Sequence, residues 1–211
     1  MSEKKSSILV NTIVILIVTF VAVAGLAVVY QVTKEPIAQA EANAKAAVYA
    51  AVFTEADSFT ELENAEALTA NSQAAIERAE LGGCSVNEVL TANRENGETL
   101  GYVIAATSPN GYGGDIQIAV GISNAGVITG FNVISNNETA GLGSKCTKAD
   151  FTSQFEGKNA EMLEYTKTGA VADNEIDAIS GATRTTNAVT QAVNTAIIFY
   201  NENFAENVKG E

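Results

Sequence analysis

A long uncharged run near the N-terminus constrains this chain more than any other feature of its sequence. Residues 6–33 contain no charged side chain, and the residues from Ile8 to Tyr30 are almost all apolar. A helix of about 20 apolar residues is long enough to cross the hydrocarbon core of a bilayer. The run exceeds the apolar segment of a signal peptide, and no small-residue cleavage site clearly follows it. We therefore predict a retained membrane-spanning helix over residues 8–32.

The charges that flank this run predict its orientation. Lys4 and Lys5 stand before it, within a short tail of residues 1–7. Basic residues beside a membrane helix stay preferentially in the cytoplasm. We therefore expect a single pass with a cytoplasmic N-terminus, which places the rest of the chain outside the cytoplasm.

The composition excludes several classes of function. The chain of 211 residues has 12 Lys and Arg against 25 Asp and Glu, which gives a formal net charge of -13. A surface with this charge repels nucleic acid, so no nucleic-acid partner is expected. His is absent, which removes His-based catalytic triads and His metal ligands, and no metal site is predicted.

Two cysteines, Cys84 and Cys146, leave three possibilities open. They are too few for an iron–sulfur cluster or a four-cysteine zinc site within this chain. They could form one disulfide outside the cytoplasm. Two separate buried thiols are favoured, because nothing in the sequence places the two residues together. A metal shared with another subunit is the third possibility.

The chain beyond the apolar run divides into a helical connector over residues 33–83 that packs on a domain over residues 84–211. Pro36 suits the first turn of a helix that we predict to continue to Phe53. Residues 54–83 are acidic and rich in Ala, and they indicate short helices or loops. After residue 84, alternating apolar residues and turn signals predict strands. The predicted strands are residues 85–92, 100–107, 116–122 and 127–134.

These elements predict an α+β fold with an antiparallel sheet and flanking helices. Residues 123–126, S-N-A-G, supply a hairpin turn between the last two strands, and the lack of β-α-β alternation argues against a Rossmann domain. Residues 147–176 indicate mixed helix and loop, with core positions expected at Phe151, Phe155, Met162, Leu163 and Tyr165. A final helix is predicted from the helical spacing of Val189, Val193, Ala196, Ile197 and Tyr200.

The stretch from residue 177 to residue 186, D-A-I-S-G-A-T-R-T-T, leads into this final helix. Thr185 or Thr186 is expected to cap the helix, because a hydroxyl there can accept from the open amides of the first turn. A helix start attracts anions, and Gly181 and Ala182 leave room for a bulky group. Thr183 then presents a hydroxyl beside a site suited to phosphate. A capped helix without any ligand is the alternative.

Two glycine-rich loops interrupt the predicted sheet. The first, N-G-Y-G-G-D at residues 110–115, has three glycines that let the backbone approach a planar ligand while Tyr112 packs against it. A flexible hairpin loop is the alternative for this segment. The second loop is N-E-T-A-G-L-G-S-K at residues 137–145.

Together these stretches resemble the FMN-binding domains of the Rnf electron-transport complex and of the sodium-pumping NADH:quinone reductase. S-G-A-T at residues 180–183 is similar to the family's S/T-G-A-T flavinylation motif. The two loops resemble the family's G-Y-G-G-P-I and E-T-P-G-L-G loops, with Asp115 and Ala140 in place of Pro. The resemblance covers most of the chain outside residues 54–83. The chain length looks more like the G subunit of the Rnf complex than the C subunit of the reductase.

The resemblance implies a covalent FMN, which a flavin transferase attaches as a phosphoester to Thr183. Asp177 corresponds to the acid upstream in the motif. Glu138 would either bond the flavin or cap its own loop. The residues expected to bind the cofactor are Ser180, Gly181, Ala182, Thr185, Gly111, Tyr112, Gly113, Gly114, Glu138, Thr139, Gly141 and Leu142.

The resemblance also implies a place in a larger assembly of the bacterial cell membrane. The chain would be an electron-transfer subunit that joins other membrane subunits and couples ferredoxin:NAD electron transfer to Na⁺ or H⁺ translocation. It would be part of that enzyme without a complete active site or a catalytic residue of its own, because the cofactor carries the redox chemistry. The alternatives are a stand-alone anchored flavoprotein, the C subunit of the NADH:quinone reductase, and an anchored binding module without flavin.

Overall fold

The structure is a computed structural model that describes residues 2–205, with the side chains described from residue 10 onward. The chain forms two compact units, residues 1–44 and residues 45–211. Each unit is described by itself.

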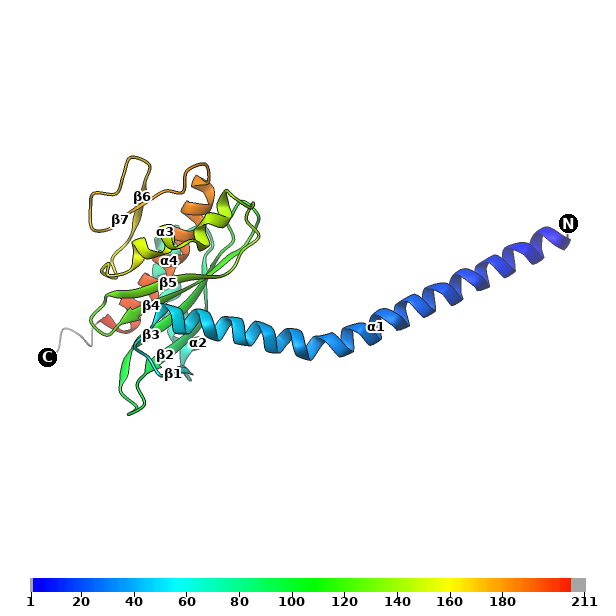
Figure 1. The fold of residues 1–211 in the computed structure, drawn as a ribbon, viewed down its shortest axis with the longest axis horizontal. Helices are drawn as coiled ribbons and strands as arrows, with labels where there is room; N and C mark the ends of the chain where they lie inside the picture. Colours follow the sequence, from blue (N-terminus) through cyan, green and yellow to red (C-terminus); the bar gives the residue numbers. More distant parts are fainter. Residues whose placement is uncertain (1, 206–211) are drawn as a thin grey trace. The chain divides into compact units, whose positions relative to one another are not determined.

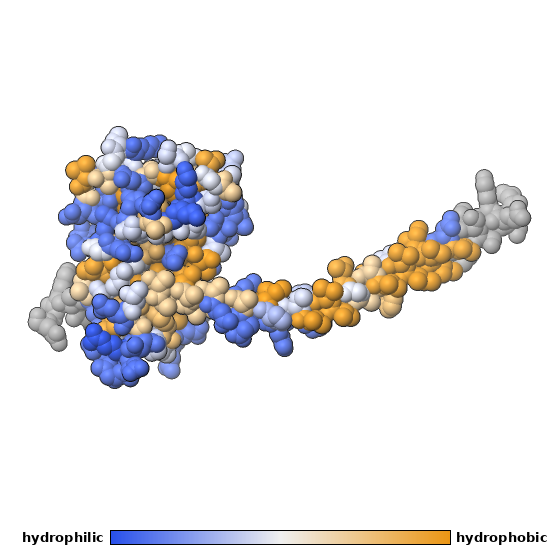
Figure 2. All heavy atoms as spheres, viewed as in Figure 1, coloured by the Kyte–Doolittle hydropathy of each residue, from blue (hydrophilic) through white to orange (hydrophobic). Residues whose placement is uncertain are grey.

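The described residues of the first unit, 2–44, all belong to α1, which runs from Ser2 to Val52. In the described part of the chain, this is the one helix long and apolar enough to cross a membrane, and Figure 2 shows hydrophobic residues along much of it and hydrophilic residues along another part. The hydroxyl of Thr19 donates to the backbone carbonyl of Ile15 at 2.8 Å, so this polar side chain is satisfied within the helix. That pairing suits an apolar surrounding, where an unbonded hydroxyl would be costly.

Pro36 lies inside α1, so the prediction that it begins a new helix is wrong. Proline has no N–H to give to the carbonyl four residues earlier and crowds that carbonyl, which is why the sequence favoured a helix start there. The helix continues because the residues on both sides are good helix formers, with Ala and Glu abundant after Pro36.

The second unit is built on a five-stranded sheet whose spatial order follows the chain, β1-β2-β3-β4-β5, with antiparallel neighbours throughout (Figure 1). The strands are β1 (Ser58–Glu61), β2 (Ser85–Asn93), β3 (Thr99–Ser108), β4 (Ile116–Ser123) and β5 (Ile128–Ser135). The structure confirms the four strands predicted after residue 84 and the α+β class. β1 was missed: residues 54–83 contain this strand in addition to the helix α2 (Ala65–Arg78).

Helices cover one face of this sheet. The main core joins apolar residues of β3, β4 and β5 to α4 (Thr183–Asn203), and residues of α2 pack against it. The helical spacing that predicted α4 is confirmed by burial, since Val189, Val193, Ala196, Ile197 and Tyr200 are all buried.

The last turns of α1 cover the other face, where Tyr49 and Val52 pack with Phe53 against β2, β3 and β4. The Val52 carbonyl accepts a hydrogen bond from the Thr129 hydroxyl at 2.7 Å. A Cβ atom at Gly121 would lie 2.4 Å from that carbonyl oxygen, so glycine permits the helix end to rest directly on the sheet.

Residues 143–177 form short elements that add buried side chains to the main core. These are the 3-10 helix η1 (Gly143–Thr147), α3 (Ala149–Thr152), the 3-10 helix η2 (Ser153–Phe155) and a parallel strand pair, β6 (Glu164–Thr166) with β7 (Glu175–Asp177). Phe151, Phe155 and Leu163 are buried as expected, whereas Met162 is 43% exposed. Leu163 instead of Met162 faces inward, because Asn194 bonds both backbone groups of Leu163 and fixes this segment's register.

Candidate functional site

A cavity of about 370 Å³ lies at the N-terminus of α4 and joins the two glycine-rich loops to the S-G-A-T segment. Because neighbouring strands are antiparallel, the end of β3, the start of β4 and the end of β5 lie at the same end of the sheet. The loops at residues 109–115 and 136–142 therefore meet there. The cavity is lined by Tyr112, Glu138, Thr139, Leu142, Gly143, Gly181, Ala182, Thr183, Arg184 and Thr185.

Thr183 is the first residue of α4, and it lies in the wall of this cavity. The helix begins three to four residues earlier than the sequence indicated, and Ala182 occupies the N-cap position without a side-chain hydrogen bond. The prediction that Thr185 or Thr186 caps the helix is therefore wrong. A helix start without a side-chain cap keeps amide donors and the positive end of its dipole available to an anion.

The two threonine hydroxyls make tertiary and turn contacts instead of capping. Thr186 accepts a bond from the Ile179 amide at 3.0 Å and donates to the Ala182 carbonyl at 3.1 Å, which closes the turn before α4. Gly181 lies in this turn with φ +78°, a conformation that glycine adopts without strain. The turn holds the Thr183 hydroxyl at the cavity.

Glu138 joins the two loops to α4. Its Oε1 accepts a hydrogen bond from the Gly113 amide at 3.0 Å, and its Oε2 accepts one from the Thr185 hydroxyl at 2.5 Å. Of the two roles that the sequence left open for Glu138, these contacts favour the structural one.

Exposed apolar side chains stand at the mouth of the cavity. Tyr112 is 71% exposed and Leu142 is 47% exposed, although both line it. Large apolar side chains on a soluble surface mark a binding site when they gather around a concave region. A planar ring could lie between them, with a phosphate at the start of α4.

The glycines of the first loop allow tight backbone packing. A Cβ atom at Gly111 would lie 2.3 Å from the Gly114 carbonyl, and one at Gly113 would lie 1.9 Å from the Asn137 carbonyl. Gly114 has φ +114°, which side chains rarely adopt. These three glycines shape the loop around Tyr112 without lining the cavity themselves.

Three residues expected at the cofactor, Asp177, Ser180 and Gly141, line a neighbouring cavity of about 750 Å³. Its wall also includes Lys145 and Lys148. Asp177 accepts a hydrogen bond from the Ala170 amide at 2.6 Å, so its carboxylate also closes the loop before β7. The structure therefore separates these three residues from the cavity that holds Thr183.

Sequence reasoning missed two residues of the site. Gly143 and Arg184 line the cavity, and the Arg184 guanidinium donates to the Asn110 carbonyl at 3.1 Å. Gly143 stands in the second glycine-rich loop, so its place beside Leu142 was a usable signal. The contact between Arg184 and Asn110 joins positions 74 residues apart, and no local pattern indicates it.

Both cysteines are free and buried, which confirms the favoured interpretation of two separate thiols. Burial raises the pKa of the Cys146 thiol to about 11, and the nearby Glu138 carboxylate adds to this effect. Burial also raises the pKa of Cys84. Neither thiol is activated as a nucleophile, because the reactive form is the thiolate.

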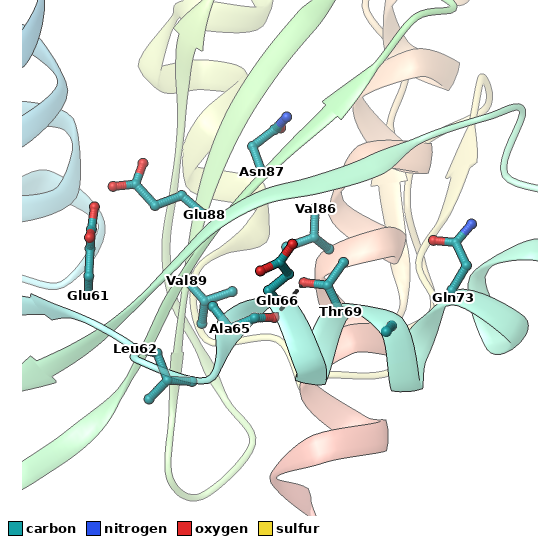
Figure 3. A pocket seen from close by; sticks show the side chains of 11 residues that line it. Glu61, Leu62, Ala65, Glu66, Thr69, Gln73, Val86, Asn87, Glu88 and Val89 are labelled. Atoms are coloured by element: carbon teal, nitrogen blue, oxygen red, sulfur yellow. Dashed lines mark hydrogen bonds between the residues drawn. The ribbon is translucent and has the colours of Figure 1, made fainter.

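A third cavity, of about 550 Å³, lies between β2 and α2 and is lined by the carboxylates of Glu61, Glu66 and Glu88 (Figure 3). Glu88 accepts a hydrogen bond from the Tyr49 hydroxyl at 2.8 Å and pairs with Lys45. These contacts tie the end of α1 to the sheet. An acidic lining opposes a phosphate group, so this cavity is not a candidate for the flavin.

Comparison with known proteins agrees with this site. The family described as "FMN-binding domain" matches residues 111–198, a span that contains most of the first loop, the whole second loop, the S-G-A-T segment and most of α4. The family described as "RnfG N-terminal region" matches residues 1–52. These matches identify an FMN-binding domain that follows a candidate membrane helix.

Relatives with curated names identify the family more closely. The G subunit of the Na⁺-translocating ferredoxin:NAD⁺ oxidoreductase complex of Acetobacterium woodii is 43% identical over 109 residues, which are 51% of this chain and 52% of that protein. The G subunit of the ion-translocating oxidoreductase complex of Aliivibrio fischeri is 32% identical over 193 residues, which are 90% of this chain and 89% of that protein. The chain belongs to this family of G subunits, and it is associated with the membrane. It spans about half the length of the Acetobacterium relative.

A solved structure also overlaps with the fold. The crystal structure of Shewanella oneidensis NqrC superposes with a TM-score of 0.48 at 22% identity, over 59% of this chain and 61% of that chain.

Proposed function

We propose that this chain is the electron-transferring G subunit of an ion-translocating ferredoxin:NAD oxidoreductase complex and carries FMN as a phosphoester on Thr183. The observation that carries the proposal is the position of Thr183. Its hydroxyl stands at the uncapped start of α4, in a cavity that the two glycine-rich loops complete. The names of the Acetobacterium and Aliivibrio relatives support the assembly, and the FMN-binding domain match supports the cofactor.

The residues present fit FMN by their chemistry. The open amides at the start of α4 suit a phosphate diester, and Arg184 stands at the same wall. Tyr112 and Leu142 offer apolar surface to the isoalloxazine, and their exposure leaves an edge of the site open to a redox partner. Bound there, the flavin would supply the capacity to accept and donate electrons, which no side chain of this site has.

In this proposal the residues of the site bind and position the flavin, and none of them is itself oxidised or reduced. Thr183 holds the cofactor by a bond without a dissociation rate, which suits a carrier outside the cytoplasm. Glu138 and the glycines shape the loops. Maturation requires a flavin transferase, and the ferredoxin, NAD and ion sites belong to partner subunits. The orientation follows Lys4 and Lys5, with the domain outside the cytoplasm.

The test is the intact mass of the denatured protein from its native host, followed by peptide mapping. We expect a mass increase of one FMN less one water, confined to the peptide that contains Thr183. The Thr183→Val variant should lose this mass, whereas the exposed Thr168→Val variant, a matched control, should keep it. Native protein with an unmodified Thr183, from cells that contain the transferase, would contradict the covalent attachment.

A further inference from the structure

Glu138 lines the cavity at the start of α4 and accepts hydrogen bonds from two separate parts of the chain there. The carboxylate lies between the loop at residues 110–115 and the first turn of α4, and each oxygen accepts a bond from one of them. The two partners, Gly113 and Thr185, are 72 residues apart in the chain. Without the Glu138 carboxylate between them, the Gly113 amide and the Thr185 hydroxyl would each lose the hydrogen bond that fixes its position.

Two glycines, Gly111 and Gly143, lie next to this carboxylate and have no side chain to occupy its space. A Cβ atom at Gly143 would lie 2.2 Å from Oε2 of Glu138 and 2.6 Å from the Thr185 hydroxyl. A Cβ atom at Gly111 would lie 2.8 Å from Oε1. Neither glycine has a positive φ; a side chain at Gly143 would meet the carboxylate and the Thr185 hydroxyl, and one at Gly111 would meet the carboxylate as well as the Gly114 carbonyl, which is nearer at 2.3 Å. The loops are thus shaped to fit a carboxylate.

Among the residues whose side chains are described, no cation forms an ion pair with this carboxylate, and Arg184, which lines the same cavity, donates to the Asn110 carbonyl instead. In the part of the chain whose side chains are described, the two ion pairs are Lys45 with Glu88 and Arg94 with Glu98. Glu138 accepts its two hydrogen bonds from an amide and a hydroxyl, which are both neutral groups. Its field reaches the neighbouring buried Cys146, where it helps to raise the pKa of the thiol.

We propose that Glu138 is the positioning residue of the flavin site and also a fixed negative charge that lowers the reduction potential of the flavin. As a positioning residue, it fastens the loop with Tyr112 to the helix start with Thr183. As a charge, it opposes reduction: the oxidised ring is neutral, and two electrons with one proton leave it negative. The second role rests on the proposed function, whereas the first does not.

Two substitutions separate these roles. In Glu138→Gln the amide oxygen can accept from Gly113 and the amide nitrogen can donate to Thr185, so the loops stay joined while the charge is removed. Glu138→Ala removes both. Glu95→Gln is the matched charge control: it lies in the turn before β3, whose ten residues place it roughly 30 Å from the loop at residues 110–115.

The first measurement is amide hydrogen exchange by NMR on the full chain without flavin. The Gly113 amide should be protected in the unaltered protein and in Glu138→Gln, and it should exchange at least tenfold faster in Glu138→Ala. Equal protection in all three proteins would overturn the positioning role, whatever the outcome for the flavin.

The second measurement is the flavin midpoint potential of the covalently loaded protein by spectroelectrochemistry. Glu138→Gln should favour the reduced flavin up to tenfold, which for a two-electron couple is a rise of about 30 mV, and Glu95→Gln should leave the potential unchanged. An unchanged or lower potential in Glu138→Gln would overturn the charge role. If the unaltered native protein carries no flavin, the proposed function fails, and with it the charge role, while the exchange measurement still decides the positioning role.

Discussion

Cys146 shows how one residue reports on the environment of the cavity at the start of α4. Its thiol is buried in the main core, in η1, directly after the loop that contains Glu138. Burial first and the Glu138 charge second keep it protonated up to a pKa of about 11. The thiol therefore behaves as a small apolar side chain at neutral pH.

This raised pKa predicts a loss of stability in alkali. The unfolded chain ionises the thiol above its ordinary pKa of 9.0, while the folded protein holds it protonated up to about pH 11. The stability that Cys146 contributes is therefore complete below about pH 9 and declines as the pH rises toward 11, by up to about 3 kcal/mol. Urea unfolding across this range should show a steeper decline in the unaltered protein than in Cys146→Ala. Parallel declines would contradict the assignment to Cys146.

For single residues, the sequence predicted which side chains lie near one another better than it predicted the hydrogen bonds between them. Thr183, Tyr112, Glu138 and Leu142 were all expected near the flavin, and the structure brings them to one cavity. The bond between Glu138 and Thr185 could not be predicted, because it depends on how a loop after β5 meets the start of α4. The expected cap is not formed because both threonine hydroxyls donate elsewhere, Thr185 to the Glu138 carboxylate and Thr186 to the Ala182 carbonyl.

Among the elements, α4 holds the domain together, and Asn194 is a buried polar residue that ties it to a neighbouring segment. Its side-chain oxygen accepts from the Leu163 amide at 2.8 Å, and its nitrogen donates to the Leu163 carbonyl at 2.9 Å. The side chain is buried, so these bonds have no competition from water. They fix the segment before β6 against the helix.

Removing this amide should be costly. We expect Asn194→Ala to lower the free energy of unfolding by about 2–3 kcal/mol, because two buried backbone groups lose their partner. The exposed Asn201 of the same helix donates to the Ala160 carbonyl at 2.9 Å. Asn201→Ala should cost less than about 1 kcal/mol, since water replaces the amide there. Chemical denaturation of both variants measures the difference, and equal losses would show that burial is not the cause.

The elements that the sequence predicted were those with a periodic apolar pattern. The strands after residue 84 and α4 each bury a face, so their spacing showed in the sequence. β1 was missed because its four residues, S-F-T-E, include one apolar side chain and lie at the sheet edge. β6 and β7 have three residues each and pair in parallel, which is too short for a pattern.

The molecule as a whole combines a candidate membrane helix with an acidic domain, and this division predicts a labelling result. Both native thiols are buried, so an introduced cysteine is the reactive one. Val171→Cys lies at a position that is 92% exposed in the domain, and Ser7→Cys lies in the predicted cytoplasmic tail. A membrane-impermeant maleimide should label Val171→Cys in intact cells and should label Ser7→Cys only after lysis. The reverse pattern would contradict the proposed orientation.

The position of α4 at the end of the element order also sets the timing of the protein's biogenesis. The sheet can pair in chain order as the polypeptide is made, but the cavity has no wall on the Thr183 side until α4 packs against the finished sheet. In a newly made chain that has not yet folded, Thr183 is therefore present before the cavity has formed. On the proposed function, a flavin bonded to Thr183 would therefore reach its final position only after synthesis and folding of the domain.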